Sequence, residues 1–416
     1  MAERVLVAGL FAAQRPLTEI RSILDEMGRL ARSAGGEVVE IVFQRRRAPD
    51  SRTLMGRGKV SEIAGRVGRD ELDLVVFFNS LTRIQQRNLE AELGCRVIDR
   101  TRLILDVFAT RARSLEGKLQ VELAQLTYML PRLTGRGVEL SRLGGGIGTR
   151  GPGETKLETD RRRIRDRIAV IRRRLEKVIR DRDIQRRSRT LRPVPLVSLV
   201  GYTSAGKSTL FRRLTGQDVT VSSRLFSTLD PLLRRVDLSD IESGCFFLLS
   251  DTVGFIRDMP AELFRSFRAT LEEVVHADIL LNIVDGAATD SDFQAREVMR
   301  VLADIGVDPE KVITVINKVD LLTASPAASS RSAGLRISAR TGEGVDQLRA
   351  CVFKRWFSGM SRYCLQIPRN DLNLKALEKW ALVVERRDLG PVVEVTLLCQ
   401  PQKMLQYKNA LAGGQP

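Results

Sequence analysis

The sequence contains little of the side-chain chemistry that histidine- or cysteine-dependent catalysis requires. Its 416 residues include a single histidine, His276, and five scattered cysteines, of which no two form a CxxC pair. Ser-His catalysis and histidine-rich metal sites are therefore not expected. An odd number of separated cysteines suits the reducing cytoplasm better than a disulfide framework, so we expect a cytoplasmic protein.

Long apolar runs are also missing. No segment approaches the ~20 apolar residues that a transmembrane helix needs, so we expect no stable membrane insertion. The short apolar run at residues 5–13 is similar to the core of a signal peptide, but Glu3 precedes it and a helical pattern follows Pro16. We therefore interpret this run as a first β-strand.

Acidic residues are too few to balance the basic ones. Asp and Glu number 51 against 68 Lys and Arg, which leaves a formal net charge of +17. Such a balance points to a polyanionic partner, either a nucleic acid or an anionic membrane surface. The excess is concentrated in residues 111–192, where 23 Lys and Arg accompany 10 Asp and Glu, so 13 of the 17 net charges lie in one segment.

The apolar pattern predicts a parallel α/β domain over residues 1–110. Short apolar runs alternate there with helical patterns, and this order is typical of a parallel sheet covered by helices. No glycine-rich phosphate fingerprint follows the first strand, so this domain is expected to bind something other than a dinucleotide, or only to position its neighbours. The expected strands are residues 5–11, 38–43, 72–78 and 95–98, and the expected helices are residues 17–34, 59–67 and 83–93.

The basic segment has the pattern of a long helical hairpin with a glycine-rich tip. Helices are expected at residues 115–133 and about 154–189, and eight glycines lie within residues 135–153. Intrahelical pairs such as Glu158 with Arg162 would explain part of the charge but not its excess. We therefore predict polyanion binding, and charge alone leaves RNA and DNA open because phosphate contacts are blind to sequence. The second helix lacks the sustained apolar face with aromatic anchors that membrane-surface binding prefers.

One segment has the pattern of a phosphate-binding loop. An apolar strand at residues 196–200 leads directly into a GxxxxGK[ST] motif, and a helical pattern follows, which is the context that this motif requires. Glycines let the backbone N–H groups point at phosphates, Lys207 would reach the β- and γ-phosphates, and Ser208 would hold Mg²⁺. The predicted contacts of this loop are Gly201, Tyr202, Thr203, Ser204, Ala205, Gly206, Lys207, Ser208 and Thr209.

Two further motifs would respond to the γ-phosphate. An apolar run at residues 246–249 leads into Asp251-Thr-Val-Gly254, where Asp251 would bind Mg²⁺ through water and the Gly254 N–H would sense the γ-phosphate. Thr228, in the segment that begins at Phe226, would complete the Mg²⁺ shell only while that phosphate is present, which makes its loop a switch. The predicted metal-binding residues are Ser208, Thr228 and Asp251; the predicted catalytic residues are Lys207, Thr228 and Gly254, and Phe226 is a further nucleotide contact.

The last two motifs predict the base. The apolar strand at residues 312–316 ends at Asn317-Lys318-Val319-Asp320. The Asp320 carboxylate can accept hydrogen bonds from N1 and N2 of guanine, whereas adenine would leave a buried carboxylate unpaired. The backbone of Ser338-Ala339-Arg340 can meet guanine O6. The motifs therefore predict a GTPase that takes GTP to GDP, with Asn317, Lys318, Asp320, Ser338, Ala339 and Arg340 at the base.

The position after the Asp-x-x-Gly motif predicts slow hydrolysis by the isolated protein. Many related switches carry a glutamine there that orients the attacking water, but this chain has Phe255, which cannot hydrogen-bond to water. We expect acceleration by a partner that fixes Thr228 and the switch loops.

The whole pattern predicts an α/β chain of four parts. A parallel α/β domain at residues 1–110 and the helical hairpin at residues 111–192 come first. A P-loop GTPase domain with a mixed, mostly parallel sheet follows at residues 193–357, and a small α+β domain at residues 358–416 includes an expected strand at residues 392–398.

Several stretches outside the common GTPase motifs resemble those of the HflX family of ribosome-associated GTPases. The resemblance extends along nearly the whole chain and is weakest after about Met360. The stretches are Leu54-Met-Gly-Arg-Gly-Lys-Val60, Asp99-Arg-Thr-Arg-Leu-Ile-Leu-Asp-Val-Phe108, Leu119-Gln-Val-Glu-Leu-Ala-Gln-Leu126, Gly145-Gly-Ile-Gly-Thr-Arg-Gly-Pro-Gly-Glu-Thr-Lys-Leu-Glu-Thr-Asp160, Asp251-Thr-Val-Gly-Phe-Ile-Arg257 and Phe267-Arg-Ala-Thr-Leu-Glu-Glu273.

The resemblance implies a function on the ribosome. HflX-like proteins bind the large ribosomal subunit in the GTP state and are thought to split stalled or idle ribosomes, particularly under heat stress. Their hairpin lies against ribosomal RNA, with its tip near the peptidyl-transferase centre. The expected partners are therefore the large subunit and its rRNA, without DNA, and a monomeric protein is expected. Arg136, Arg142 and Arg150 would then be the RNA contacts at the tip.

The sequence departs from this family at two positions of the site. Where the family usually has asparagine, which in related GTPases helps to hold potassium, this chain has the shorter Ser204, so K⁺ stimulation is in doubt. The base motif more often ends in lysine or leucine than in arginine. Because the backbone makes the contact with guanine, we expect little effect of Arg340.

Two other functions remain open. The protein could be a GTPase that assists assembly of the large subunit without splitting mature ribosomes, which sucrose-gradient profiles would distinguish. It could also be a signalling GTPase with a protein partner and no RNA, in which case its complex would survive RNase treatment.

Overall fold

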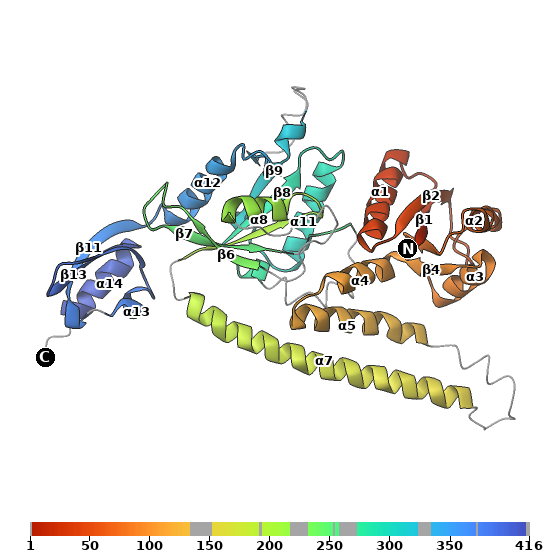
Figure 1. Cartoon of the computed structure of the whole chain (residues 1–416), viewed down its shortest axis with the longest axis horizontal. Coiled ribbons are helices and arrows are strands. Elements are labelled where there is room, and N and C mark those ends of the chain that lie inside the picture. The colour runs from red at the N-terminus through yellow and green to blue at the C-terminus, as the bar shows by residue number, and fades with distance from the viewer. Residues whose placement is uncertain are drawn as a thin grey trace. The chain divides into compact units, whose positions relative to one another are not determined.

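The computed structural model describes residues 2–133, 152–190, 194–216, 232–252, 254–257, 273–322, 334–371 and 373–412 (Figure 1). The chain forms two compact units, one built mainly from residues before Lys177 and the other mainly from Lys177 onward. The predicted α/β architecture is confirmed, with a parallel, a mixed and an antiparallel sheet. The division into four domains at the stated bounds stays a prediction.

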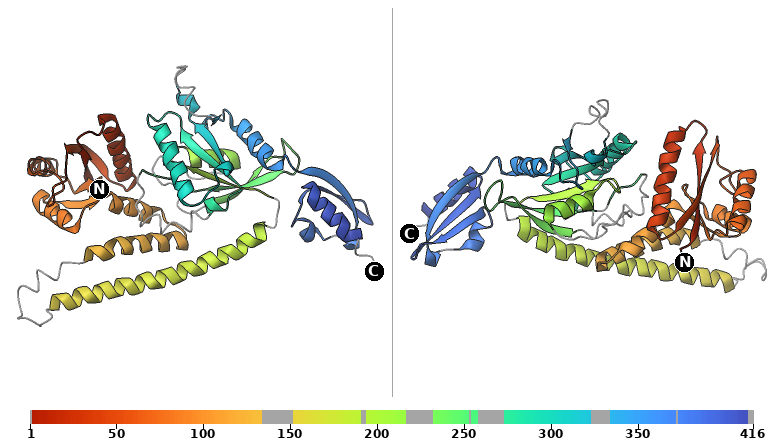
Figure 2. Two further views of the ribbon diagram at one scale, coloured as in Figure 1. Left: turned by 180° about the vertical axis from the view of Figure 1, so that it is seen from behind. Right: turned by 45° about the horizontal axis from the view of Figure 1, so that its top comes forward.

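The first unit begins with a four-stranded parallel sheet in the order β2-β1-β3-β4. Its central strand is buried from Val5 to Phe11, as expected for a parallel strand covered on both faces. Helix α1 covers one face, and α2 and α3 pack on the other (Figures 1 and 2). The elements are β1 (Arg4–Ala12), α1 (Leu17–Ser33), β2 (Glu37–Arg46), α2 (Arg57–Arg69), β3 (Leu74–Phe77), α3 (Arg83–Leu93) and β4 (Arg96–Asp99).

The apolar pattern does not predict helix α4 (Arg100–Arg111), which follows β4 directly. Buried apolar residues run almost without interruption from Leu103 to Phe108, so the segment lacks the spacing of an amphipathic helix. The side chain of Asp99 caps this helix by accepting a hydrogen bond from the backbone N–H of Arg102 at 3.0 Å.

Helices α5 (Leu115–Met129) and α7 (Pro152–Thr190) are the two predicted helices of the basic segment. The first helix was predicted to reach residue 133, but its α-helical part ends at Met129. A 3-10 turn (η1, Leu130–Leu133) continues it, because Pro131 cannot donate an α-helical hydrogen bond. The predicted tip contacts Arg136, Arg142 and Arg150 lie outside the described residues.

The two hairpin helices share a thin apolar core. Leu119 of α5 packs with Ile171 and Leu175 of α7. Next to this core, the guanidinium of Arg167 donates to both carboxylate oxygens of Glu122, at 2.7 and 2.9 Å. No helix in the described ranges is both long and apolar enough to cross a membrane.

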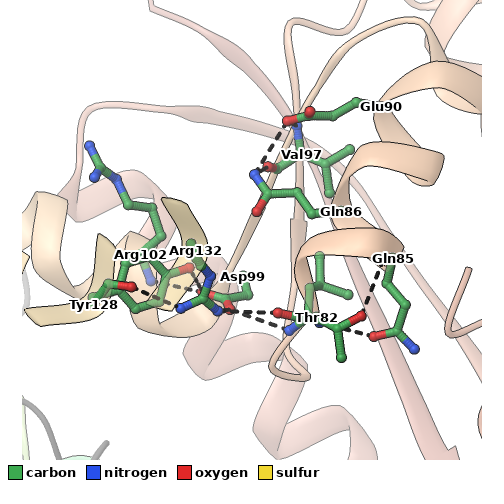
Figure 3. A network of polar contacts seen from close by, with 10 residues as sticks. Thr82, Gln85, Gln86, Glu90, Val97, Asp99, Arg102, Tyr128 and Arg132 are labelled. Atoms are coloured by element: carbon green, nitrogen blue, oxygen red, sulfur yellow. Dashed lines mark hydrogen bonds and ion pairs between the residues drawn. The ribbon is translucent and has the colours of Figure 1, made fainter. Parts of the chain in front are cut away.

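A buried polar network fastens the end of α5 to the N-terminal sheet (Figure 3). Asp99, which is 1% exposed, accepts hydrogen bonds from the Tyr128 hydroxyl and from Arg132 Nη2, both at 2.8 Å. Arg132 also donates to the Leu81 carbonyl at 3.1 Å, and its guanidinium lies 3.6 Å from the centre of the Tyr128 ring. Burial, followed by the Asp99 charge, raises the pKa of Tyr128, so the phenol stays a donor.

The second unit contains a six-stranded sheet in the order β10-β9-β8-β5-β7-β6. All pairs are parallel except the one between β6 and β7, which gives the mixed, mostly parallel sheet that the sequence predicts. The elements are β5 (Leu196–Gly201), α8 (Lys207–Thr215), β6 (Leu232–Asp237), β7 (Phe246–Asp251), β8 (Ile279–Asp285), α11 (Ser291–Asp304), η2 (Pro309–Lys311), β9 (Val312–Asn317), η3 (Val319–Leu321), β10 (Leu335–Arg336) and α12 (Val345–Phe357).

The C-terminal part of this unit is a three-stranded antiparallel sheet in the order β11-β13-β12. Helix α14 lies along one face, where Met404 packs with residues of β13 (Figure 2). Gly244 approaches this part so closely that a Cβ there would lie 2.7 Å from the Val384 carbonyl oxygen. The elements are β11 (Ser361–Pro368), η5 (Arg369–Asp371), α13 (Leu374–Leu377), β12 (Leu382–Asp388), β13 (Val392–Cys399) and α14 (Pro401–Ala412).

Candidate nucleotide-binding site

The phosphate-binding motif forms a tight loop between β5 and α8, as its sequence context predicts. Gly201 and Gly206 have φ angles of +145° and +99°, which side chains rarely permit. A Cβ at Gly201 would lie 2.3 Å from the Ile283 carbonyl oxygen, and one at Gly206 would lie 2.1 Å from Asn317 Nδ2. Both glycines are therefore required by close approach of neighbouring strands.

Lys207 starts helix α8 and points back into the loop. Its Nζ donates to the carbonyl oxygens of Gly201 and Tyr202, at 3.1 and 2.8 Å. The residue is 6% exposed, and this burial lowers the pKa of Lys207 to about 8, against a smaller opposite effect of the Asp251 charge. A buried ammonium group with so little compensating negative charge favours binding of an anion such as phosphate.

Two of the three predicted metal-binding residues meet at the end of the loop. The Ser208 hydroxyl donates to Asp251 Oδ2 at 2.9 Å, and Asp251 is fully buried at the end of β7. A hydroxyl oxygen next to a carboxylate fits Mg²⁺, which prefers hard oxygen ligands and commonly binds through one or two carboxylates. Thr228, the third predicted ligand, and Phe226 lie outside the described residues.

The residues after Asp251 are joined to the phosphate-binding loop. The backbone N–H of Phe255 donates to the Gly201 carbonyl at 3.1 Å, and the Phe255 carbonyl accepts from the Thr203 N–H at 2.8 Å. Gly254 is held beside Lys207, because a Cβ on Gly254 would lie 2.9 Å from the Lys207 Nζ. The ring of Phe255 is buried, so this side chain does not reach solvent.

Sequence reasoning missed the role of Tyr202 in this contact and the burial of Arg257. The Tyr202 hydroxyl accepts a hydrogen bond from the Arg257 backbone N–H at 2.5 Å. The Arg257 guanidinium pairs with Asp290 at 3.3 Å and lies 3.9 Å from the centre of the Phe293 ring. No local pattern distinguishes a buried arginine from an exposed one, so only the fold could show this arrangement.

Asn317 connects the phosphate-binding loop to the predicted base loop. Its Nδ2 donates to the Ala205 carbonyl at 2.8 Å, and its Oδ1 accepts from the Ala339 N–H at 2.9 Å. Lys318 has a left-handed backbone (φ 65°), and its ammonium group pairs with Asp285 at 2.6 Å. Asn317 therefore holds the two halves of the site together.

The predicted base-reading carboxylate is well oriented. Asp320 Oδ1 accepts from the Ser338 hydroxyl at 2.6 Å, and Asp320 Oδ2 accepts from Arg340 Nη2 at 2.5 Å. The hydrogen bond from Ser338, assisted by the charge of Arg340, lowers the pKa of Asp320. The structure thus brings Asp320, Ser338, Ala339 and Arg340 close together, and their contact with guanine stays a prediction.

A phosphate-binding loop after a central strand of a mixed sheet, with Asp251 at the end of the adjacent strand β7 and Asn317 at the end of β9, defines a P-loop GTPase. Three families match successive parts of the chain: "GTP-binding GTPase N-terminal" over residues 21–109, "GTP-binding GTPase Middle Region" over residues 111–189, and "50S ribosome-binding GTPase" over residues 196–318.

Curated relatives identify the family. The GTPase HflX of Caldanaerobacter subterraneus subsp. tengcongensis is 46% identical over 355 residues, which cover 85% of this chain and 81% of that protein. The GTPase HflX of Escherichia coli is 43% identical over 398 residues, covering 92% and 93%. The chain therefore belongs to the HflX family of GTPases.

Among solved structures, the fold is similar to that of a GTP-binding protein from Sulfolobus solfataricus in complex with GDP. The TM-score is 0.44 at 23% identity, with 84% of this chain and 97% of that chain covered.

Proposed function

We propose that this GTPase is a switch that binds the large ribosomal subunit in its GTP state and splits or rescues stalled and idle ribosomes in the cytoplasm. Hydrolysis is then stimulated by the ribosome. The observation that carries the proposal is the exposed arginine surface of α7. The resemblance to HflX proteins and the match of residues 196–318 to a family described as 50S ribosome-binding support it.

Most of the α7 arginines whose side chains the structure describes form no ion pair with the described residues. Arg163 and Arg167 form ion pairs, with Asp160 and Glu122 respectively. Glu158 and Arg162 do not form the intrahelical ion pair that would have explained part of the basic charge without a polyanionic partner. The exposed arginines of α7 that form no ion pair with the described residues are Arg162, Arg165, Arg172, Arg173, Arg174 and Arg180.

This surface suits an RNA partner. Arg162 and Arg174 are twelve residues apart, or roughly 18 Å along a helix at 1.5 Å per residue, so the surface spans several phosphates. Arginine forks bind phosphate oxygens in pairs, and each neutralised phosphate releases counterions. The tip residues Arg136, Arg142 and Arg150 are proposed as additional RNA contacts near the peptidyl-transferase centre.

In the nucleotide site we assign Lys207 to the β- and γ-phosphates and the N–H of Gly254 to the γ-phosphate. Ser208, Asp251 and Thr228 would hold Mg²⁺, which when bound offsets charge on the phosphates. Asp320 reads guanine N1 and N2, and the backbone of residues 338–340 meets O6. These roles rest on the contacts of Lys207, Ser208, Asp251 and Asp320 described above.

The absence of a water-positioning glutamine makes stimulation by a partner necessary. Phe255 is buried against the phosphate-binding loop and offers no hydrogen bond to water. The proposed partner therefore fixes Thr228 and the switch loops, so that γ-phosphate, water and Mg²⁺ ligands come together.

The test is GTP turnover with and without purified large ribosomal subunits at constant salt. We expect strong stimulation that is lost when residues 135–153 are deleted, while turnover without subunits stays the same. Absence of stimulation would leave the GTPase intact but remove the ribosome as partner. Sucrose gradients with mature ribosomes then separate splitting from assembly, because an assembly factor would leave mature ribosomes intact.

A further inference from the structure

The side chain of Arg340 contacts the carboxylate that is assigned to guanine. Its Nη2 lies 2.5 Å from Asp320 Oδ2, while the Ser338 hydroxyl occupies Oδ1. The Asp320 side chain keeps only 11% of its accessible surface, whereas that of Arg340 is 72% exposed. The arginine therefore lies on the solvent side of a carboxylate that is otherwise enclosed.

Ser338 and Arg340 contact Asp320 in different ways. Ser338 is fully buried, and its hydroxyl also accepts from the Thr341 N–H at 3.1 Å, so it supports the carboxylate from within the fold. The exposed guanidinium of Arg340 lies where a base edge has to approach from solvent. Only Arg340 can move away without leaving a buried polar group unsatisfied.

The backbone of Arg340 is fixed while its side chain is free to swing. Its carbonyl accepts from Arg213 Nη2 of α8 at 2.7 Å, and the neighbouring Ala339 N–H donates to Asn317 at 2.9 Å. A guanidinium attached to a rigid loop stays within reach of the carboxylate after displacement, at a high effective concentration.

We propose that Arg340 and guanine compete for the Asp320 carboxylate, so that Arg340 weakens the binding of GTP and GDP alike and favours nucleotide exchange. This rests on the proposed role of Asp320 in reading the base. Guanine needs both carboxylate oxygens for N1–H and N2–H, and the arginine holds one of them. The backbone contact with O6 is unaffected, so the arginine tunes affinity without changing which base is chosen.

The expected size follows from the exposure of the Arg340 side chain. Because this arginine is largely in solvent, the ion pair should change a dissociation constant by only roughly 1.4- to 5-fold. Because salt screens exposed charges, the effect should shrink at high ionic strength. The reacting phosphate is at the other end of the nucleotide, so kcat at saturating GTP should not change.

The experiment measures Kd for a fluorescent GDP analogue with the full chain and its variants. Arg340→Leu should bind about 1.4- to 5-fold more tightly at low salt and should converge with the unchanged protein at about 0.5 M KCl. Arg340→Lys, which keeps the charge but loses the fork, should lie between them. The matched control is Arg336→Leu, an exposed arginine with no ion pair to the described residues, and it should leave Kd unchanged.

An unchanged or weaker Kd for Arg340→Leu at low salt would overturn the competition. A separate variant tests the assignment on which it rests: Asp320→Asn should lose guanine nucleotides and gain xanthine nucleotides, because the amide can donate to the xanthine 2-oxo group. If that exchange of bases fails, Asp320 does not read the base; if it succeeds while Arg340→Leu has no effect, only the competition is wrong.

Discussion

The nucleotide site and the basic hairpin are both expected to meet phosphate groups, but they are built in opposite ways. In the nucleotide site, Lys207 is 6% exposed and its ammonium group donates to the carbonyl oxygens of the phosphate-binding loop. The hairpin presents many exposed arginines on α7, which packs against α5 through one isoleucine and a few leucines. A buried cation gains large, specific interactions with one ligand, whereas exposed cations add many small ones to an extended surface.

The sharpest test of this difference is Lys207→Ala. We expect GTP hydrolysis to fall by roughly 100-fold or more, because the β- and γ-phosphates lose their buried cation. Thermal stability without nucleotide should not fall, since burying the charge is itself unfavourable. Phosphate release and a melting curve of the same preparation check both; activity within a few-fold of the unchanged protein would contradict the assigned role.

The polar network at the base of the hairpin should matter to stability but not to hydrolysis. Asp99→Ala leaves the Tyr128 hydroxyl and the Arg132 guanidinium without their buried acceptor. We expect the unfolding free energy of the first unit to fall by about 2–3 kcal/mol. This is less than for a fully buried ion pair, because Arg132 is partly exposed. Denaturant unfolding measures it. The milder control is Asp106→Ala, because Asp106 of α4 is partly exposed and pairs with the partly exposed Arg102.

Replacing Arg172, Arg173 and Arg174 with glutamine tests the hairpin as a surface. Affinity for the large subunit should fall by roughly 10-fold or more at physiological salt. The plot of log affinity against log salt concentration should become less steep, by the amount expected for the loss of about two to three phosphate contacts. GTP turnover without subunits should not change. The matched control is Glu176→Gln on the same helix, which removes a negative charge and should strengthen binding; equal effects of both variants would exclude phosphate contacts.

Titration of Lys207 should make the Kd for nucleotide depend on pH, by at most tenfold per pH unit because a single proton is involved. The pKa of Lys207 is about 8 in this structure, and phosphates would raise it, so above pH 8 the complex holds more protons than the free protein. Kd should therefore rise with pH above about 8 and be independent of this group below it.

Stability should depend on pH in the opposite direction. The folded-state pKa of Lys207 lies below the unfolded value of 10.5, so the unfolded chain binds more protons between about pH 8 and 10.5. The contribution of Lys207 to stability therefore increases as pH rises through this window. Both dependences should disappear in Lys207→Ala; nucleotide titrations and melting curves between pH 7 and 10 would show whether they do.

Much of the site could be predicted from the sequence because its residues are constrained by one ligand. A phosphate chain and a guanine base require a turn of glycines, a lysine, a hydroxyl and a carboxylate in a fixed order along alternating strands and helices. Gly201, Gly206, Lys207 and Ser208 are therefore recognisable as a local pattern. The parallel N-terminal sheet could be predicted equally well, because strands that are buried on both faces appear in the sequence as continuous apolar runs.

The remaining features could not be predicted because they join segments that are distant in the sequence. Helix α4 has apolar residues on nearly all sides, so its periodicity is hidden. The burial of Arg257 depends on Asp290, 33 residues later in the chain. Glu158 and Arg162 are four residues apart, which is the spacing of an ion pair on a helix. Their side chains nevertheless do not form this ion pair in the structure.

By itself, the sequence determined that this protein is a P-loop GTPase with a strongly basic helical segment, because backbone turns, helical spacing and net charge are properties of neighbouring residues. Only the tertiary structure decided that Asp99 anchors the hairpin and that Arg340 shares the Asp320 carboxylate. Those contacts depend on packing, which selects among many charged side chains the few that come within hydrogen-bonding distance.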